Sequence, residues 1–267
     1  MFIESVPVLD NREIAENVWI IRFRSRRIAP AVRPGQFLNL KPDSSWDPLL
    51  RRAYSVHQIL EDDVIELVYN VHGRGSQIFA AKRPGAPIDI MGPLGLPFHV
   101  EEPFDTAILV SGGLGIAPMP ILGRDLARRG VEVLNVHGSR RGSMIPQDDR
   151  LINPIWATDD GSLGIRGNVI TALEELFSER EPSTFGRLRL FACGPNVMLS
   201  ALERFCVNRG LPLEVSLECQ MACGVGICQG CPVEMKGDET RYTLVCTHGP
   251  NYDVADIELA SLPTEHG

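Results

Sequence analysis

Five of the seven cysteines in this chain lie near its C-terminal end, and the spacing of four of them constrains the local fold more than any other feature. Cys223, Cys228 and Cys231 form the pattern C-x4-C-x2-C within MACGVGICQGCPV, and Cys246 follows within YTLVCTHGP. The stretch is rich in glycine and has few side chains that can pack as a hydrophobic core. The thiols themselves must therefore hold something that orders this region.

Two kinds of metal group take four cysteines, namely an iron–sulfur cluster and a structural zinc ion. The C-x4-C-x2-C run with a distant fourth cysteine is the plant-type spacing for a [2Fe–2S] cluster. Gly224, Gly226 and Gly230 let the backbone wrap closely around such a cluster, with N–H groups available to the sulfurs. Zinc sites usually take two close pairs, and only Cys228 and Cys231 form one. The spacing favours the cluster and leaves zinc as the alternative.

Length and charge narrow the class of protein. A chain of 267 residues exceeds what one hydrophobic core usually serves, so two or three compact units are expected. The net charge of −8 gives no electrostatic reason to bind nucleic acid or an anionic membrane surface. The sequence shows no signal-peptide pattern and no apolar run approaching the ~18 residues that span a bilayer. We expect a cytoplasmic protein without nucleic-acid or membrane partners, in which clustered cysteines are metal ligands or redox groups rather than disulfides.

The pattern of the chain predicts three domains and an α+β multidomain fold. Residues 1–100 alternate short β-rich runs with glycine and proline, which predicts an antiparallel β-barrel. Residues 101–212 alternate apolar strands with helices, which predicts a parallel-sheet α/β domain. Residues 213–267 form the small cysteine-rich domain. The predicted strands are 18–23, 37–41, 53–60, 64–71, 86–95, 107–113, 131–139 and 188–194, and the predicted helices are 76–82, 118–130, 168–179 and 196–210.

Two motifs in the first region have the chemistry to hold a phosphate and a planar ring. In RRAYS, Arg52 can neutralise a phosphate, the Tyr54 ring can flank a ring system, and the Ser55 hydroxyl can bond to it. The GRGS turn, residues 73–76, opens the short predicted helix and leaves unpaired N–H groups facing outward. A strand with a solvated arginine and a tight turn without ligand are the alternatives.

Two glycine-containing turns follow strands of the second region, where open α/β sheets bind nucleotides. SGGLGIAPMP follows the first of these strands and ACGPN follows the last, and close-packed turns without ligand are the alternative reading. Cys193 can approach a nicotinamide or pack in the core. Arg140 or Arg141 can bind the 2′-phosphate of NADP or have no ligand, so the sequence does not distinguish NAD from NADP. The nucleotide-binding candidates are Gly112, Gly113, Gly115, Cys193, Gly194 and Pro195.

Together these motifs resemble the ferredoxin-NADP reductase superfamily, with RAYS and GRGS on a barrel that would hold FAD, and GGLGIAP and CGPN on a nucleotide domain. MACGVGICQGCPV followed by YTLVCTHGPNY is similar to the electron-transfer subunit of type B dihydroorotate dehydrogenase, and the likeness covers nearly the whole chain. The resemblance implies that Cys223, Cys228, Cys231 and Cys246 ligate the cluster. The FAD-binding candidates are Arg52, Ala53, Tyr54, Ser55, Tyr69, Asn70, Val71, Gly75 and Ser76.

The resemblance also implies a partner and a direction of electron flow. An FMN-containing catalytic subunit would oxidise dihydroorotate for pyrimidine synthesis, and this chain would pass the electrons through the cluster and FAD to NAD+. Two catalytic and two electron-transfer subunits would form a heterotetramer, and this chain needs no acid/base pair of its own. Similar subunits of ferredoxin-NAD(P) reductases, sulfide dehydrogenases and hydrogenases are the enzymatic alternatives. A zinc-stapled binding module is the alternative that is not an enzyme.

Overall fold

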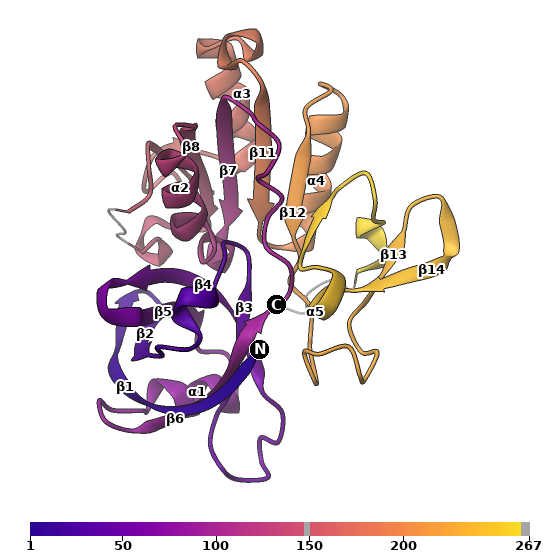
Figure 1. Cartoon of the computed structure of the whole chain (residues 1–267). Coiled ribbons are helices and arrows are strands. Elements are labelled where there is room, and N and C mark those ends of the chain that lie inside the picture. Colours follow the sequence, from indigo (N-terminus) through magenta and orange to yellow (C-terminus); the bar gives the residue numbers. More distant parts are fainter. Residues whose placement is uncertain (147–149, 263–267) are drawn as a thin grey trace.

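The computed structural model describes residues 1–146 and 150–262, and it divides into the three architectures expected from the sequence (Figure 1). A closed antiparallel barrel is followed by a largely parallel sheet with helices, and a small hairpin lies beside both. The predicted fold class is therefore confirmed. In the described ranges, no helix is both long and apolar enough to cross a bilayer.

The barrel contains six antiparallel strands in the spatial order β1-β2-β5-β4-β3-β6, and β6 closes it by pairing with β1. All five strands predicted in this region are present. A short helix, α1, follows β5 and begins at the GRGS turn. The elements are β1 (Phe2–Ala15), β2 (Val18–Arg24), β3 (Phe37–Lys41), β4 (Arg52–Leu60), β5 (Val64–Asn70), α1 (Arg74–Ala80) and β6 (Pro87–Leu94).

The seven-stranded sheet that follows has the order β10-β9-β8-β7-β11-β12-β15, in which only β15 runs antiparallel to its neighbour. Its central strand β7 is buried on both faces, as parallel strands usually are. The elements are β7 (Thr106–Gly112), α2 (Met119–Arg128), β8 (Glu132–Ser139), β9 (Pro154–Thr158), β10 (Ile165–Arg166), α3 (Val169–Glu179), β11 (Leu188–Cys193), α4 (Asn196–Val207), β12 (Leu213–Ser216) and β15 (Asn251–Asp253).

Alternate side chains of β7 enter different hydrophobic cores, which fixes the helices on the two faces of the sheet. Ile108 and Val110 pack in the core that contains residues of α3 and α4. Ala107 and Leu109 pack in the core that contains residues of α2. This layering leaves the loops at the carboxyl ends of the strands directed toward the barrel (Figure 1).

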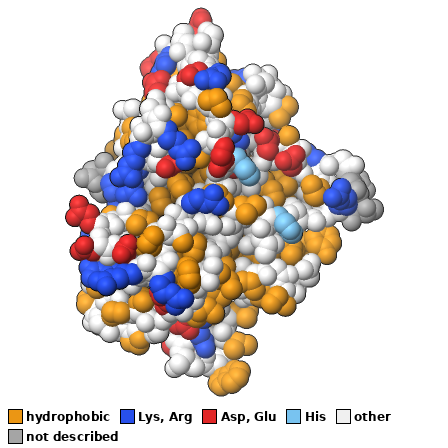
Figure 2. Space-filling view, viewed as in Figure 1, with side chains coloured by type: hydrophobic (Ala, Val, Ile, Leu, Met, Phe, Trp, Pro, Cys, Tyr) orange, Lys and Arg blue, Asp and Glu red, His pale blue; other side chains and the backbone are white. Residues whose placement is uncertain are grey.

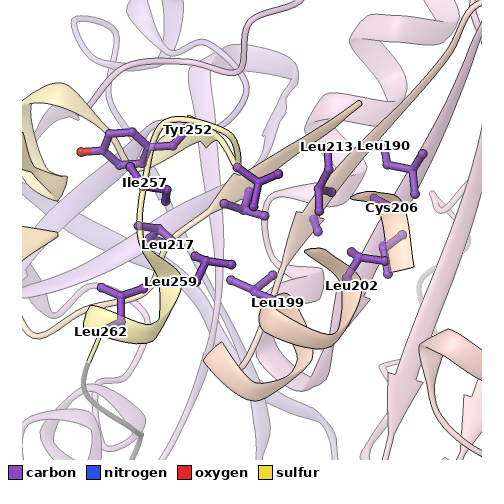
Figure 3. Close-up of a cluster of buried hydrophobic side chains, with 14 of the residues drawn as sticks. Leu190, Leu199, Leu202, Cys206, Leu213, Leu217, Tyr252, Ile257, Leu259 and Leu262 are labelled. Atoms are coloured by element: carbon purple, nitrogen blue, oxygen red, sulfur yellow. The ribbon is translucent and has the colours of Figure 1, made fainter. Parts of the chain in front are cut away.

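The C-terminal region joins the rest of the molecule through a shared core. Its elements are the hairpin of β13 (Pro232–Met235) and β14 (Asp238–Leu244), and the short helix α5 (Val245–His248). Leu199 and Leu202 of α4 pack with Leu217, Tyr252, Ile257 and Leu259 from the segments around the cysteines (Figure 3). Cys206 lies in the same core. The cysteine-rich region thus packs against the seven-stranded sheet, and β12 and β15, which lie beyond residue 212, extend that sheet.

Candidate functional site

A cavity of about 530 Å³ lies where the three regions meet. The barrel forms one wall, the loop after β7 contributes Leu114 and Ala117, and residues 216–219 with Met221 form the wall nearest the cysteines. Most of the FAD candidates predicted from the sequence line this cavity. Those that do are Arg52, Ala53, Tyr54, Ser55, Asn70, Gly75 and Ser76.

Two of the predicted FAD candidates are placed elsewhere. The Tyr69 ring is almost completely buried in the barrel core, and its hydroxyl donates a hydrogen bond to Asn11 Oδ1 at 2.8 Å. Val71 packs on the same core, and its backbone N–H donates to Asn17 Oδ1. Side chains alternate along a strand, so the neighbours of the cavity-lining Asn70 point away from the cavity.

The charged end of the cavity is built by Arg52 and the start of α1. A Cβ atom at Gly75 would lie 3.2 Å from Arg52 Nε, so the missing side chain is what lets the guanidinium lie over the turn. Ser76 Oγ accepts hydrogen bonds from the N–H groups of His72 and Gly73, at 2.9 and 3.1 Å, and holds the turn in place. An arginine above exposed backbone suits a pyrophosphate.

The other polar groups of the cavity suit a flavin ring. Asn70 Oδ1 is buried and has no hydrogen-bond partner among the described residues, so it presents an acceptor to a ligand's N–H or O–H group. Burial raises the pKa of the Tyr54 phenol well above its usual value, so this side chain stays neutral. Its ring meets that of Phe79 edge-on, with the centroids 5.7 Å apart. The residues present therefore fit FAD.

The two predicted nucleotide turns lie against one another at the carboxyl edge of the sheet. A Cβ at Gly115 would lie 2.1 Å from the carbonyl oxygen of Cys193, and one at Gly112 would lie 3.3 Å from Pro195. Gly194, with φ +154°, is packed against the backbone of Gly112. Gly113, at φ +53°, has open space at its Cβ position. The structure thus brings all six nucleotide candidates together.

Cys193 is almost completely buried beneath these turns, and its thiol donates to Glu218 Oε1 at 3.7 Å. Glu218 lines the flavin cavity, so the pair connects the nucleotide turns to that cavity. The sequence analysis missed Glu218 because a single glutamate before a cysteine run carries no distinguishing pattern. Of the two arginines considered for a 2′-phosphate, Arg141 instead donates to Glu16 of the β1–β2 turn at 2.7 Å, and Arg140 is exposed.

Backbone N–H groups point at the cysteine sulfurs predicted to hold the cluster. Cys223 Sγ accepts from the N–H groups of Val225 and Cys228, both at 3.4 Å, and Cys246 Sγ accepts from Gly226 at 3.2 Å. Burial alone would raise the pKa of Cys223, but the backbone donors lower it to about 7. Such N–H···S bonds are the outer-shell contacts that stabilise thiolates bound to iron.

The loop before β13 can adopt this path only because its glycines lack side chains. Gly224 has φ +70°, and a Cβ there would lie 2.0 Å from Asn39 Nδ2 on β3 of the barrel. Asn39 Nδ2 itself donates to the carbonyl of Cys223 at 3.4 Å, which ties the loop to the barrel. Cys228 is exposed at the surface, whereas Cys231 and Cys246 are buried.

The fifth thiol of the region, Cys219, lies between the cavity and the predicted ligands. It lines the cavity, and burial together with contacts to Cys231 and Cys246 raises its pKa to about 12. In the described part of the chain, no three His, Cys, Asp or Glu side chains are grouped so as to hold a metal ion. The backbone N–H groups directed at Cys223 Sγ and Cys246 Sγ fit the thiolates of an iron–sulfur cluster.

Known proteins share the sequence of the cysteine region and the fold of this chain. A family model described as the iron-sulfur cluster binding domain of dihydroorotate dehydrogenase B matches residues 218–258. The solved structure of an NADH-dependent reduced ferredoxin-NADP oxidoreductase, described for flavin-based electron bifurcation, superposes with a TM-score of 0.85 at 27% identity. It covers 96% of this chain and 91% of its own. A ferredoxin reductase of carbazole 1,9a-dioxygenase, at 20% identity and a TM-score of 0.68 over 80% of this chain and 68% of its own, shares the fold.

Curated relatives match over almost their entire length. The dihydroorotate dehydrogenase B (NAD(+)) electron transfer subunit of Geobacillus kaustophilus is 36% identical over 262 residues, which covers 96% of this chain and 98% of the relative. The subunit of the same name from Enterococcus faecalis is 33% identical over 266 residues, with the same two coverages. The chain therefore belongs to the family of dihydroorotate dehydrogenase B electron transfer subunits.

Proposed function

We propose that this chain passes electrons from an FMN-containing dihydroorotate dehydrogenase subunit to NAD+, as a step of de novo pyrimidine synthesis in the cytoplasm. The observation that carries the proposal is a shared wall: Cys219 and Met221 line the flavin cavity, and they lie four and two residues before Cys223, the first of the predicted cluster ligands. A flavin and a cluster bound at these two places would be neighbours beside one shared hydrophobic core.

The residue roles follow from the two sites. Arg52 and the turn at Gly75 and Ser76 would hold the FAD pyrophosphate, and Ala53, Tyr54, Ser55 and Asn70 would surround the rest of the cofactor. The turns that contain Gly112, Gly113, Gly115, Gly194 and Pro195 would hold NAD, with Cys193 beneath them. Cys223, Cys228, Cys231 and Cys246 would bind the cluster. The corresponding domains would be 1–100, 101–212 and 213–267, of which 147–149 and 263–267 lie outside the described residues.

The reaction balances without a catalytic acid or base in this chain. Oxidation of dihydroorotate to orotate in the partner releases two electrons and two protons, reduction of NAD+ consumes two electrons and one proton, and the second proton is released to water. When bound, FAD supplies the conversion between single electrons from the cluster and a hydride for the nicotinamide. The side chains of this protein bind and orient the cofactors, and the heterotetramer of two subunits of each kind would bring them to the partner's FMN.

Reconstitution tests this function directly. The chain, loaded with FAD and cluster, is mixed with the catalytic subunit from the same organism, and NADH formation is followed after addition of dihydroorotate and NAD+. We expect NADH only when both subunits are present. If the chain reduced NAD+ with electrons from reduced ferredoxin but not with electrons from dihydroorotate, its function would be that of a ferredoxin-NAD(P) reductase subunit. An ultraviolet–visible spectrum without flavin or cluster bands would instead support the zinc-stapled module.

A further inference from the structure

A buried hydrogen bond from His57 on β4 joins the barrel to the seven-stranded sheet. The His57 side chain is almost completely buried, and its Nδ1 lies 2.7 Å from the carbonyl oxygen of Ala117. A carbonyl oxygen can only accept a hydrogen bond, so Nδ1 carries a proton and donates it. The bond therefore connects a barrel strand to the turn between β7 and α2.

A β-bulge in β4 directs His57 out of the barrel. In the pairing of β4 with β5, the chain advances by two residues from Val56 to Gln58 while β5 advances by one, so His57 is the extra residue. Val56 and Ile59 both pack on the barrel core, which shows that the alternation of side chains shifts at the bulge. Bulges beside active sites commonly re-aim a side chain in this way.

Glu66 on β5 lies on the other side of the His57 ring. Its carboxylate is fully buried, with Arg22 Nε 2.6 Å from Oε2, and it also forms an ion pair with Arg150, which precedes β9 of the sheet. His57 Nε2 lies 4.0 Å from Glu66 Oε1. One ring nitrogen thus faces the carboxylate and the other faces the Ala117 carbonyl, so the ring is oriented from both sides.

The acceptor of the His57 bond belongs to the turn that carries nucleotide candidates. Leu114 and Ala117 of this turn line the flavin cavity, and the Ala117 N–H donates to the Leu114 carbonyl at 2.9 Å. Gly113 and Gly115 lie in the same turn. Because His57 holds Ala117 from β4, it sets the position of this turn relative to the strand that carries the RRAYS motif.

A second connection between the barrel and the sheet involves α2. Arg124 Nη1 donates to the carbonyl of Ile59 at 2.8 Å, and Ile121 packs in the barrel core. Figure 1 shows α2 above the barrel, and in Figure 2 the barrel and the sheet meet in one continuous surface. Arg124 and Ile59 are not among the described residues that line the flavin cavity. The Arg124 contact thus joins the same two units without holding the nucleotide turn.

We propose that His57 is a positioning residue for hydride transfer, because its hydrogen bond to Ala117 holds the nucleotide turn in place against the flavin cavity. This inference rests on the proposed function, in which the turn holds NAD and the cavity holds FAD. A misplacement of ~1 Å between reacting groups can cost about a hundredfold in rate. One hydrogen bond to the turn therefore influences the reaction, although His57 itself does not line the cavity.

Stopped-flow reduction of the bound FAD by saturating NADH tests the proposal without the catalytic subunit. His57→Phe keeps an aromatic ring but has no donor, and we expect the rate to fall at least about tenfold. Its FAD affinity, from fluorescence titration of the apoprotein, should stay within about twofold of wild type. His57→Asn should restore most of the rate, because its amide nitrogen takes the place of Nδ1.

Arg124→Met is the matched control, since it removes the second connection between the same two units. It should lower the free energy of unfolding, as His57→Phe does, but keep the wild-type rate of flavin reduction. The flavin difference spectrum produced by the unreactive analogue 1,4,5,6-tetrahydro-NAD reports nicotinamide placement at equilibrium. This spectrum should be weaker in His57→Phe than in Arg124→Met.

The outcomes separate the inference from the function on which it rests. Wild-type protein whose flavin is not reduced by NADH would overturn the proposed function. A wild-type rate in His57→Phe, or equal losses of rate in His57→Phe and Arg124→Met, would overturn the positioning role alone. If His57→Phe did not retain FAD, His57→Asn and His57→Gln would carry the test, because glutamine places its amide one bond farther from the backbone. An Asn variant no faster than the Gln variant would then overturn the proposal.

Discussion

Arg52 is the residue whose chemistry depends most directly on a bound ligand. Its guanidinium lies over Gly75 and donates to the carbonyl of Leu50 at 2.7 Å, which leaves further donors for a phosphate. We predict that Arg52→Ala removes a charge-assisted contact of about 1.5–3 kcal/mol and weakens FAD binding about ten- to a hundredfold. Flavin fluorescence titration of the apoprotein measures this. Arg26→Ala, at an exposed position elsewhere on the barrel, should leave FAD affinity unchanged, and equal affinities for both variants would contradict the assignment.

At the residue scale, the sequence indicated those candidate positions that belong to a pattern of spacing or of adjacent residues. Six candidates from RRAYS and GRGS line the cavity together with Asn70, whereas Tyr69 and Val71, the neighbours of Asn70 in sequence, pack on the barrel core. Glu218 and Asn39 were missed, because each is a single polar residue whose partner lies far away in sequence. Only the fold reveals such contacts.

At the scale of elements, the turns after β7 and β11 work as one unit. Gly115 touches the backbone of Cys193, so an added methyl group must push the two turns apart. We predict that Gly115→Ala raises the KM for NADH in a dye-reduction assay and lowers the free energy of unfolding by about 1–3 kcal/mol. Gly123→Ala in α2, where a Cβ would make only ordinary contacts, is the matched control. A Gly115→Ala protein with wild-type KM would separate these turns from nucleotide binding.

The elements that sequence periodicity missed are those with an interrupted pattern or very short length. β1 has register shifts at Val8/Asp10 and Glu13/Ala15, and these break the alternation by which a strand is recognised. β9 covers only Pro154–Thr158, and β12 and β15 are shorter still. These short strands form because an existing sheet edge offers hydrogen bonds, which is information that local sequence does not contain.

For the whole molecule, composition and pattern predicted three architectures but not how they share a core. One hydrophobic cluster joins Phe37 of the barrel, Ile108 of the nucleotide sheet, and Cys231 and Cys246 of the cysteine region. Contacts between residues this far apart in sequence depend on the packing of complete elements. The consequence is functional, since the shared core holds the flavin cavity and the predicted cluster ligands in fixed relative positions.

Because the flavin cavity and the predicted cluster ligands are separate sites, a single substitution can distinguish the activity that needs the cluster from the activity that needs only FAD. Cys228 is exposed, so Cys228→Ser should remove the cluster without disturbing the core, and FAD should stay bound. We predict that this variant loses dihydroorotate-dependent NAD+ reduction with the catalytic subunit but keeps much of the NADH-to-dye activity, because the dye can draw electrons directly from FAD. Iron, sulfide and flavin analyses accompany both assays, and Cys219→Ser, outside the four-cysteine pattern, should retain its iron. Full iron content and full coupled activity in Cys228→Ser would refute the ligand assignment, and orotate formation by the isolated chain would refute the division of labour between the subunits.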